Sequence, residues 1–213
     1  MSPILYYLPE GPPTRGVLFL IRYLNLDVEL KLCRTYMNEH KDPKYLKLNP
    51  CHTVPTLDDN GFVLIDSQAI AVYLAEQYGA SSNLFGNSVK DRSSVLQRLF
   101  FNSTMFEQVK LILAPIIYGD VTKFEEKALA KIYEMLDCLE IFLTGQDFVA
   151  GSSLTIADFF LVNNVITFMH LKFDMDKYKH IKDWVQRMKV LTGFTECEEG
   201  AISLSKLVLP KLK

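Results

Sequence analysis

The sequence predicts an α/β domain at residues 1–78 and an all-helical domain at residues 88–213, joined by a linker at 79–87. Short apolar runs alternate with amphipathic stretches in the first third of the chain. No convincing strand pattern follows residue 89, and the linker is mostly small and polar. With 213 residues, of which 49 % are hydrophobic and 23 % charged, the chain has the composition of a globular protein and ample length for a core.

The elements of the first domain follow from local patterns. The apolar run at 3–7 predicts a strand, and the proline-rich loop 8–15 leads into a helix whose apolar face spans 17–24. Alternating residues at 27–33 predict a second strand, and 42–48 predicts a short helix.

A hairpin and a capped helix are expected next. Asp58-Asp59-Asn60-Gly61 separates two apolar runs, 54–57 and 62–65, and Asn-Gly in that place is a strong hairpin signal. Asp66-Ser67 is a good start for a helix over 67–78, which Gly79 is placed to end. The first amides of such a helix attract anions. The resulting order of strands and helices matches a thioredoxin-like domain.

Two linked strings carry a family resemblance. Asn-Pro-x-His-Thr-Val-Pro-Thr-Leu at 49–57 and Asp-Ser-x-Ala-Ile-x-x-Tyr-Leu at 66–74 resemble the glutathione-binding region of glutathione transferases, above all the insect delta and epsilon classes. The resemblance spans nearly the whole chain and is strongest at 3–79 and 145–160. It implies the glutathione transferase fold, glutathione as co-substrate, a homodimer and a cytoplasmic location.

The resemblance also implies how glutathione is held. Asp66 and Ser67 would take the γ-glutamyl end, Val54 the cysteinyl backbone, and His52 with His40 the glycyl carboxylate. Gln68 stands where the family often has Arg or His, so it offers a hydrogen bond without charge. The glutathione-binding residues expected are His40, His52, Thr53, Val54, Pro55, Asp66, Ser67 and Gln68.

The group that activates the glutathione thiol is where the sequence departs from the family. A free thiol titrates near about 8.5, so a donor to the sulfur is needed at neutral pH. Delta and epsilon members usually have Ser in the loop after the first strand, but this chain has Gly11, which has no hydroxyl. Tyr7 is a candidate donor, although it can equally be a core tyrosine. The Thr14 hydroxyl, backbone amides near Gly11 or a bound water are further alternatives.

A second, hydrophobic substrate is expected beside the sulfur, between the domains. The resemblance implies walls from the loop, from the 105–118 helix and from the tail. Glu107 and Lys110 there are either a solvated ion pair or a polar anchor for a ligand hydroxyl. The residues expected at this site are Leu8, Glu10, Glu107, Lys110, Leu111, Ala114, Tyr118 and Leu207.

The second domain is predicted to consist of helices at 89–118, 123–143, 156–170 and 178–191, followed by a partly apolar tail at 201–213. Pro115 is expected to kink or end the first of them. Thr155 and Asp158 have the spacing of a capping box, with Leu154 and Phe159 as a hydrophobic staple. Asp158 is therefore predicted to be structural.

Composition excludes several functions. A net charge of −2 argues against nucleic-acid binding, and no run of about 18 apolar residues predicts a membrane span. Four scattered cysteines without a CxxC predict neither a disulfide scaffold nor a metal site. The predicted function is an enzyme, a glutathione transferase of detoxification that conjugates, reduces or isomerises small hydrophobic electrophiles. The alternative is a glutathione-dependent carrier of hydrophobic ligands such as xenobiotics, pigments or steroid-like hormones.

Overall fold

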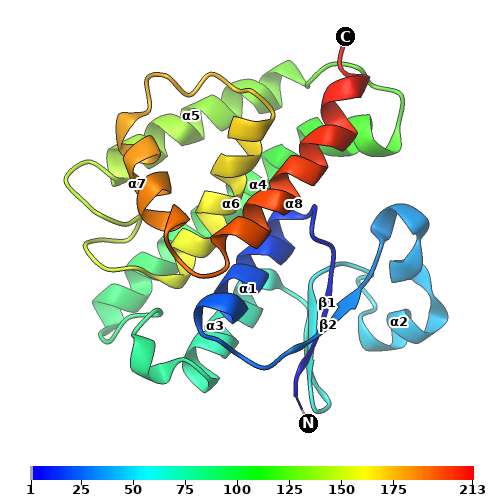
Figure 1. Cartoon of the computed structure of the whole chain (residues 1–213), viewed down its shortest axis with the longest axis vertical. Helices are drawn as coiled ribbons and strands as arrows, with labels where there is room; N and C mark the ends of the chain where they lie inside the picture. The colour runs from blue at the N-terminus through cyan, green and yellow to red at the C-terminus, as the bar shows by residue number, and fades with distance from the viewer. Residues whose placement is uncertain (1) are drawn as a thin grey trace.

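A mixed four-stranded sheet forms the first part of the computed structural model, which describes residues 2–213 (Figure 1). Strand β1 (Ile4–Tyr7) pairs in parallel with β2 (Glu29–Leu32) and antiparallel with β3 (Thr56–Asp59). Strand β4 (Phe62–Leu64) pairs antiparallel with β3, which gives the order β2-β1-β3-β4. Along the chain, the strands and helices follow one another in the order that the sequence predicts.

Three helices accompany the sheet. They are α1 (Pro12–Tyr23), α2 (Pro43–Leu48) and α3 (Ser67–Gln77). Two 3₁₀ turns, η1 (Thr35–Met37) and η2 (Glu39–Lys41), lie between β2 and α2. Helices α1 and α3 contact each other and bury Leu20 and Ile70. The thioredoxin-like prediction for the first part of the chain is confirmed.

The hairpin between β3 and β4 turns at the predicted residues. Asn60 and Gly61 both have positive φ, at 53° and 94°, as a two-residue hairpin turn requires. Gly79 also follows α3 as expected, but its φ is −118°, so it is not a left-handed cap. A Cβ there would lie 2.9 Å from a Leu24 methyl group, and close packing is therefore the reason for glycine.

The second part of the chain is helical, as predicted. Its helices are α4 (Val89–Tyr118), α5 (Glu126–Phe142), α6 (Ile156–His170), α7 (Lys179–Lys189) and α8 (Phe194–Val208), with short 3₁₀ turns η3 (Ala80–Ser82) and η4 (Leu209–Lys211). Pro115 does not end α4, which continues to Tyr118. The predicted tail is the end of a regular helix, α8, that begins at residue 194.

Helix α6 lies at the centre of the helical part (Figure 1), and Asp158 fixes its start. The Asp158 carboxylate accepts hydrogen bonds from the Thr155 amide at 2.8 Å and the Thr155 hydroxyl at 2.9 Å. It also accepts from the Val149 amide at 2.9 Å and the Trp184 indole at 3.0 Å. Burial raises the pKa of Asp158 to about 6, against the pull of these four bonds. The capping-box prediction is confirmed, and Asp158 is structural.

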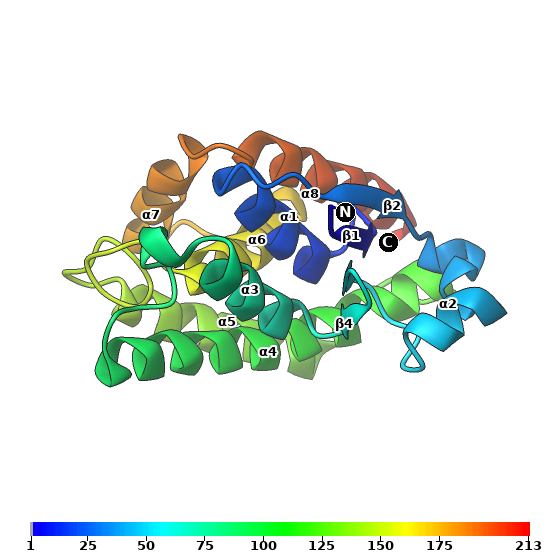
Figure 2. The same ribbon diagram turned by 90° about the horizontal axis from the view of Figure 1, so that it is seen from below.

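The two parts of the chain meet along α1, which packs against α3, α6 and α8 (Figure 2). Arg15 is fully buried at this junction and donates to the Cys197 carbonyl at 3.1 Å and the Asn163 carbonyl at 3.3 Å. At Gly200 of α8, a Cβ would lie 2.2 Å from the Pro9 carbonyl oxygen. Glycine therefore lets α8 press directly against the loop between β1 and α1.

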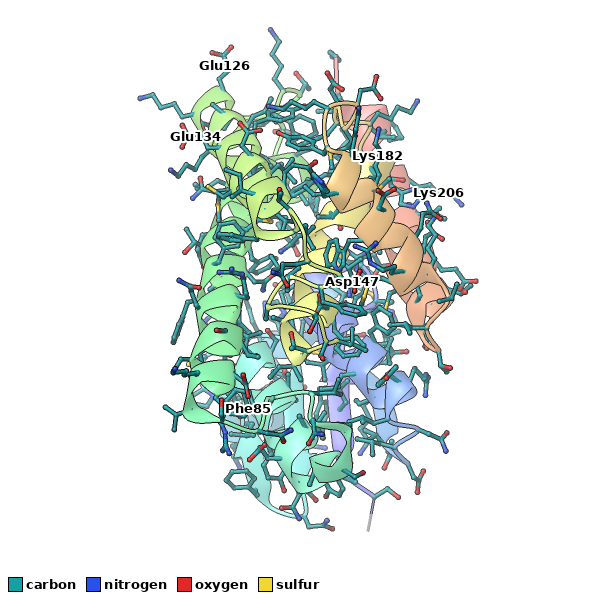
Figure 3. The ribbon with its side chains drawn as sticks, turned by 90° about the vertical axis from the view of Figure 1, so that its left-hand side faces the viewer. Phe85, Glu126, Glu134, Asp147, Lys182 and Lys206 are labelled. Carbon is teal, nitrogen blue, oxygen red and sulfur yellow. The ribbon has the colours of Figure 1, made fainter. Side chains whose placement is uncertain are left out.

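Helix α5 forms one outer edge of the helical part and is amphipathic. Its buried face carries Ile132, Leu136 and Leu139, whereas Glu126 and Glu134 project outward (Figure 3). This division between an apolar and a charged face is typical of a surface helix of a globular domain. Within residues 2–213, no helix is long and apolar enough to cross a membrane.

Candidate functional site

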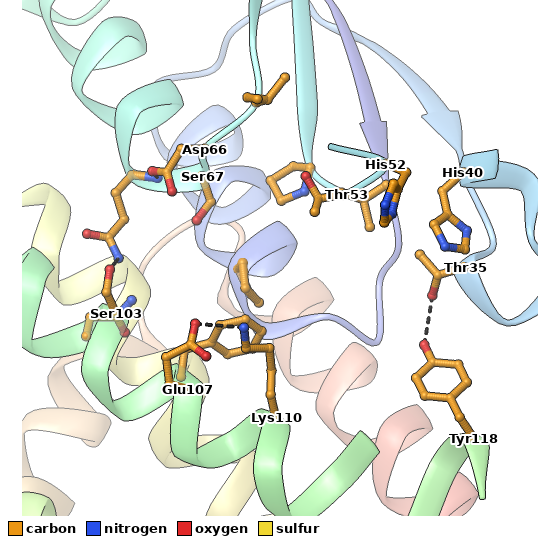
Figure 4. Close-up of a pocket in the computed structure, with 17 residues that line it drawn as sticks. Thr35, His40, His52, Thr53, Asp66, Ser67, Ser103, Glu107, Lys110 and Tyr118 are labelled. Atoms are coloured by element: carbon orange, nitrogen blue, oxygen red, sulfur yellow. Dashed lines mark hydrogen bonds and ion pairs between the residues drawn. The ribbon is translucent and has the colours of Figure 1, made fainter. Parts of the chain in front are cut away.

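Two neighbouring pockets lie where the sheet domain meets α4 and α8. The larger one, here called the polar pocket, has a volume of about 480 Å³. It is lined by Pro13, Thr35, His40, His52, Thr53, Val54, Pro55, Ile65, Asp66, Ser67, Gln68, Asn102, Ser103, Phe106, Glu107, Lys110 and Tyr118. All eight residues expected to bind glutathione are in this set, so the structure brings them together (Figure 4).

One end of the polar pocket is the start of α3. The Asp66 carboxylate caps this helix by accepting from the Gln68 amide at 2.8 Å and the Ala69 amide at 3.0 Å. Both bonds use the same carboxylate oxygen, and Ser67 stands beside it as the first helical residue. A helix start with a hydroxyl and a carboxylate can receive both ends of an amino-acid zwitterion.

Gln68 spans the gap between the sheet domain and α4. Its side-chain amide donates to the Ser103 hydroxyl at 2.6 Å. Ser103 is a pocket residue that sequence reasoning missed, because nothing in the local pattern of α4 indicates what its polar residues face. The Gln68–Ser103 bond ties the start of α3 to the wall opposite (Figure 4).

The middle of the polar pocket is the loop before β3. Buried Asn49 and Tyr45 hold this loop, since the Asn49 amide donates to the Thr53 carbonyl at 2.9 Å and the Tyr45 hydroxyl donates to the same oxygen. The Val54–Pro55 peptide bond is cis. The Val54 amide and carbonyl make no backbone hydrogen bond to any described residue. They are thus available to an extended peptide, as in strand addition.

Two histidines face each other at the far end. The His40 and His52 ring centroids are 6.0 Å apart, and the left-handed backbone of His52, with φ of 46°, helps to place its ring. His40 Nδ1 is shielded from solvent and has no hydrogen-bond partner among the described residues. Burial lowers the pKa of His40, as do, to a lesser degree, Lys41 and His52. A bound carboxylate would supply the missing partner.

The smaller pocket, here called the apolar pocket, has a volume of about 150 Å³. It is lined by Leu8, Glu10, Gly11, Pro12, Tyr36, Phe106, Val109, Lys110, Leu113, Ala114, Ile117, Tyr118, Leu204 and Leu207. Phe106, Lys110 and Tyr118 line both pockets and so form their common wall. A molecule that fills the polar pocket can therefore present one end to the apolar pocket.

Six of the eight residues expected at the hydrophobic site line the apolar pocket, namely Leu8, Glu10, Lys110, Ala114, Tyr118 and Leu207. Glu107 lines the polar pocket instead, where its carboxylate pairs with the Lys110 ammonium at 2.7 Å. Leu111 lines neither pocket and is 54 % exposed, because its position on α4 turns it toward solvent. The Tyr118 hydroxyl lies 2.9 Å from the Thr35 hydroxyl and links α4 to η1 across the site.

Sequence reasoning missed part of the apolar wall. Val109, Leu113 and Ile117 have helical spacing, which the sequence displays, but the same spacing also describes residues of a closed core. Leu204 belongs to α8, whose first half was not predicted as a helix. The remaining missed residues of the two pockets are Pro12, Pro13, Thr35, Tyr36, Ile65, Asn102 and Phe106.

Gly11 lies at the edge of the apolar pocket, immediately before α1. Its amide donates to the Leu8 carbonyl at 3.0 Å, and Pro12 and Pro13 have no N–H. Few backbone donors are therefore left near Gly11. A Cβ at Gly11 would lie 3.4 Å from the Leu8 oxygen and 3.6 Å from the Thr14 hydroxyl oxygen, which are ordinary contacts. The Thr14 hydroxyl itself is buried and has no hydrogen-bond partner among the described residues.

Tyr7 lines neither pocket. Its partly buried ring packs against the core, and its carbonyl accepts from the Cys33 amide at 2.8 Å. A hydrogen bond to Glu196 chiefly raises the pKa of Arg22, near the far end of α1, and Tyr7 contributes to this shift to a smaller degree. This placement is the one expected of a core tyrosine.

Comparison with known proteins agrees with the geometry. Residues 5–82 match the family model of the glutathione S-transferase N-terminal domain, and residues 101–190 match that of the C-terminal domain. The chain is 37 % identical to glutathione S-transferase D7 of Drosophila melanogaster over 98 % of its own length and 94 % of that protein.

Solved structures give the same result. A delta-class glutathione transferase of Nilaparvata lugens is 37 % identical with a TM-score of 0.93, covering 99 % of this chain and 100 % of the other. A glutathione transferase homologue of Drosophila mojavensis with bound glutathione is 31 % identical with a TM-score of 0.95, covering 99 % and 98 %. The chain belongs to the glutathione S-transferase family. These comparisons favour the transferase function over the carrier alternative.

Proposed function

We propose that this chain binds glutathione in the polar pocket and transfers it to small hydrophobic electrophiles held in the apolar pocket. The observation that carries the proposal is the convergence of a helix start, an unpaired backbone segment at Val54 and a histidine pair on one cavity. These groups match, in order, the γ-glutamyl zwitterion, the peptide backbone and the glycyl carboxylate of glutathione.

Each end of glutathione would meet a complementary charge. Asp66 would receive the γ-glutamyl ammonium, while the hydroxyl and the backbone amide of Ser67 would receive its carboxylate. His52 and His40 would face the glycyl carboxylate at the other end. Thr53 and Pro55 would shape the floor on either side of Val54, and Gln68 would close the side toward α4 through Ser103.

With the peptide so placed, the thiol would point to the shared wall of the two pockets, beside Gly11. The start of α1 favours a negative sulfur there, since unpaired helix amides carry partial positive charge. Pro12 and Pro13 remove two of those amides. We therefore expect the thiol pKa to be lowered only modestly, so that turnover rises as the pH approaches the ordinary thiol value of about 8.5.

Calorimetry and a conjugation assay test this function together. S-methylglutathione, which has no free thiol, should bind, and 1-chloro-2,4-dinitrobenzene should be conjugated to glutathione with a rate that rises with pH. Both binding and conjugation should be weakened in the Asp66→Ala variant. The proposal fails if S-methylglutathione does not bind, or if binding is the same in the variant.

We further propose that the protein is a cytoplasmic homodimer. Phe62 on β4 and Phe100 on α4 are 51 % and 69 % exposed, and a contact between two copies of the chain would bury such large apolar side chains. All four cysteines are unpaired, which suits a reducing compartment. Light scattering of the purified protein would contradict the dimer if it gave the 24.4 kDa mass of one chain.

A further inference from the structure

Two of the residues that line the apolar pocket are charged, Glu10 and Lys110, and they are placed differently. The Lys110 ammonium is already paired with Glu107 at 2.7 Å, and both of these side chains are about half exposed. An exposed pair of this kind is well solvated and contributes little. Glu10, in contrast, stands on the wall formed by the β1–α1 loop and α8.

The Glu10 carboxylate is only half satisfied. Its Oε1 accepts a hydrogen bond from the Ser203 hydroxyl of α8 at 3.0 Å. Its Oε2 is shielded from solvent and has no hydrogen-bond partner among the described residues. An oxygen of this kind is costly to leave without a donor. Glu10 lines the apolar pocket, and the last torsion of a glutamate side chain is broad, so Oε2 can turn to meet a donor that is bound there.

The charged groups around Glu10 indicate which kind of hydrogen-bond donor suits its free oxygen. Arg15 is fully buried nearby, and its hydrogen bonds go to uncharged oxygens. Burial lowers the pKa of Arg15 to about 10, and Cys197 and Glu10 oppose that shift. Burial also raises the pKa of the Cys197 thiol to about 12, so this thiol is neutral. Glu10 therefore already has a cation, Arg15, in its neighbourhood, and an uncharged donor such as a hydroxyl suits its unpaired oxygen.

We propose that Glu10 determines specificity by accepting a hydrogen bond from the neutral hydroxyl group of an otherwise apolar substrate in the apolar pocket. This inference rests on the proposed function and narrows its substrate class to apolar electrophiles that carry a hydroxyl. It assigns the polar anchor to Glu10, rather than to the Glu107–Lys110 pair, because Glu107 lies outside the apolar pocket and has its partner.

Two probes that differ by one methyl group test the proposal, 2-naphthol, which has a hydroxyl donor, and 2-methoxynaphthalene, which has none. Their affinities are measured by calorimetry at neutral pH on protein saturated with S-methylglutathione. The wild-type protein should prefer 2-naphthol by roughly tenfold, as expected for a hydrogen bond to a charged acceptor. Glu10→Leu should abolish the preference, and Glu10→Gln, which keeps a carbonyl acceptor, should give an intermediate value. Glu107→Gln should keep the full preference.

Equal affinity of the two probes for wild-type protein would overturn the inference, as would a preference that survives Glu10→Leu or disappears in Glu107→Gln. Should Glu10→Leu fail to fold, the decrease expected in Glu10→Gln decides, and an unchanged preference there contradicts the proposal. Binding of S-methylglutathione is measured in every variant. If the wild-type protein does not bind S-methylglutathione, the proposed function is refuted instead, so the two failures are distinguishable.

Discussion

The polar and apolar pockets share a wall, but the chain builds them in different ways. Seven of the eight residues expected to bind glutathione in the polar pocket come from two short segments, 52–55 and 65–68, whose geometry is set by local capping and by the buried Asn49. The apolar pocket is assembled from a loop near the N-terminus, from α4 and from α8. Co-substrate binding is therefore encoded mainly in local sequence, whereas substrate choice and thiol activation depend on packing between distant segments.

The largest effect on ligand affinity is expected in the polar pocket, where local sequence sets the binding residues. Asp66→Ala should weaken S-methylglutathione binding by roughly 10- to 100-fold, because it removes a charged hydrogen bond of about 1.5–3 kcal/mol. It should also cost about 1 kcal/mol of stability through loss of the α3 cap. Calorimetry and thermal unfolding measure the two losses.

Asp66→Asn is the matched control, because asparagine caps a helix as well as aspartate does. Stability should be kept while most of the affinity is lost. If Asp66→Asn binds S-methylglutathione as tightly as the wild type, Asp66 contributes only as a cap and its proposed contact with the ligand ammonium is wrong.

A smaller effect is expected where the two pockets meet. Gly11→Ser should raise conjugation at neutral pH by about tenfold, since a hydroxyl that lowers the thiol pKa by one unit supplies about 1.4 kcal/mol. The new side chain fits, with its Cβ in ordinary contact with the Leu8 oxygen. Rate measurements across pH should show the profile displaced to lower pH. Gly11→Ala adds the same Cβ without a hydroxyl, and an equal gain there would rule out the hydroxyl explanation.

The histidine pair predicts a pH dependence of a few-fold. Burial, with Lys41 and His52, lowers the pKa of His40, so this ring is neutral in the free protein at pH 7. A carboxylate bound beside it favours the protonated form, and S-methylglutathione affinity should therefore rise as the pH falls below about 6.5. His40→Gln should weaken this trend, while the distant His180→Gln should not. A trend that is equal in all three proteins would exclude His40.

The smallest effect is predicted for Tyr7→Phe. It should change the turnover number by less than about twofold, because it removes only a hydroxyl that lies outside both pockets. Tyr7 lines neither pocket. Steady-state kinetics with 1-chloro-2,4-dinitrobenzene measure the change. A loss of tenfold or more would show that its hydroxyl reaches the sulfur after all.

The same contrast explains how much the sequence predicted. The Asn60-Gly61 turn, the Asp66 cap and the Thr155–Asp158 box are local devices, and each is present in the structure as expected. All eight residues expected to bind glutathione line one cavity. Seven of them come from the two short, contiguous strings at 49–57 and 66–74, and His40 is the exception.

Features that depend on packing between distant segments were harder to predict from the sequence. The start of α8 was missed, since charged residues and Gly200 reduce its helical signal, while the reason for glycine there is the Pro9 carbonyl close to it in space. Pro115 remains inside α4, because tertiary packing around α4 outweighs one lost backbone bond. Leu111 shares the spacing of the pocket residues but faces solvent, a distinction that only the packing of α4 makes.

A crystal structure of the protein with S-hexylglutathione tests the central claim most directly. The account predicts the γ-glutamyl group on Asp66 and Ser67, the glycyl carboxylate beside His40 and His52, and the sulfur in contact with Gly11. The hexyl chain should then enter the apolar pocket between Leu8 and Leu204. A peptide bound outside the polar pocket, or a sulfur placed against Tyr7 and away from Gly11, would contradict the account.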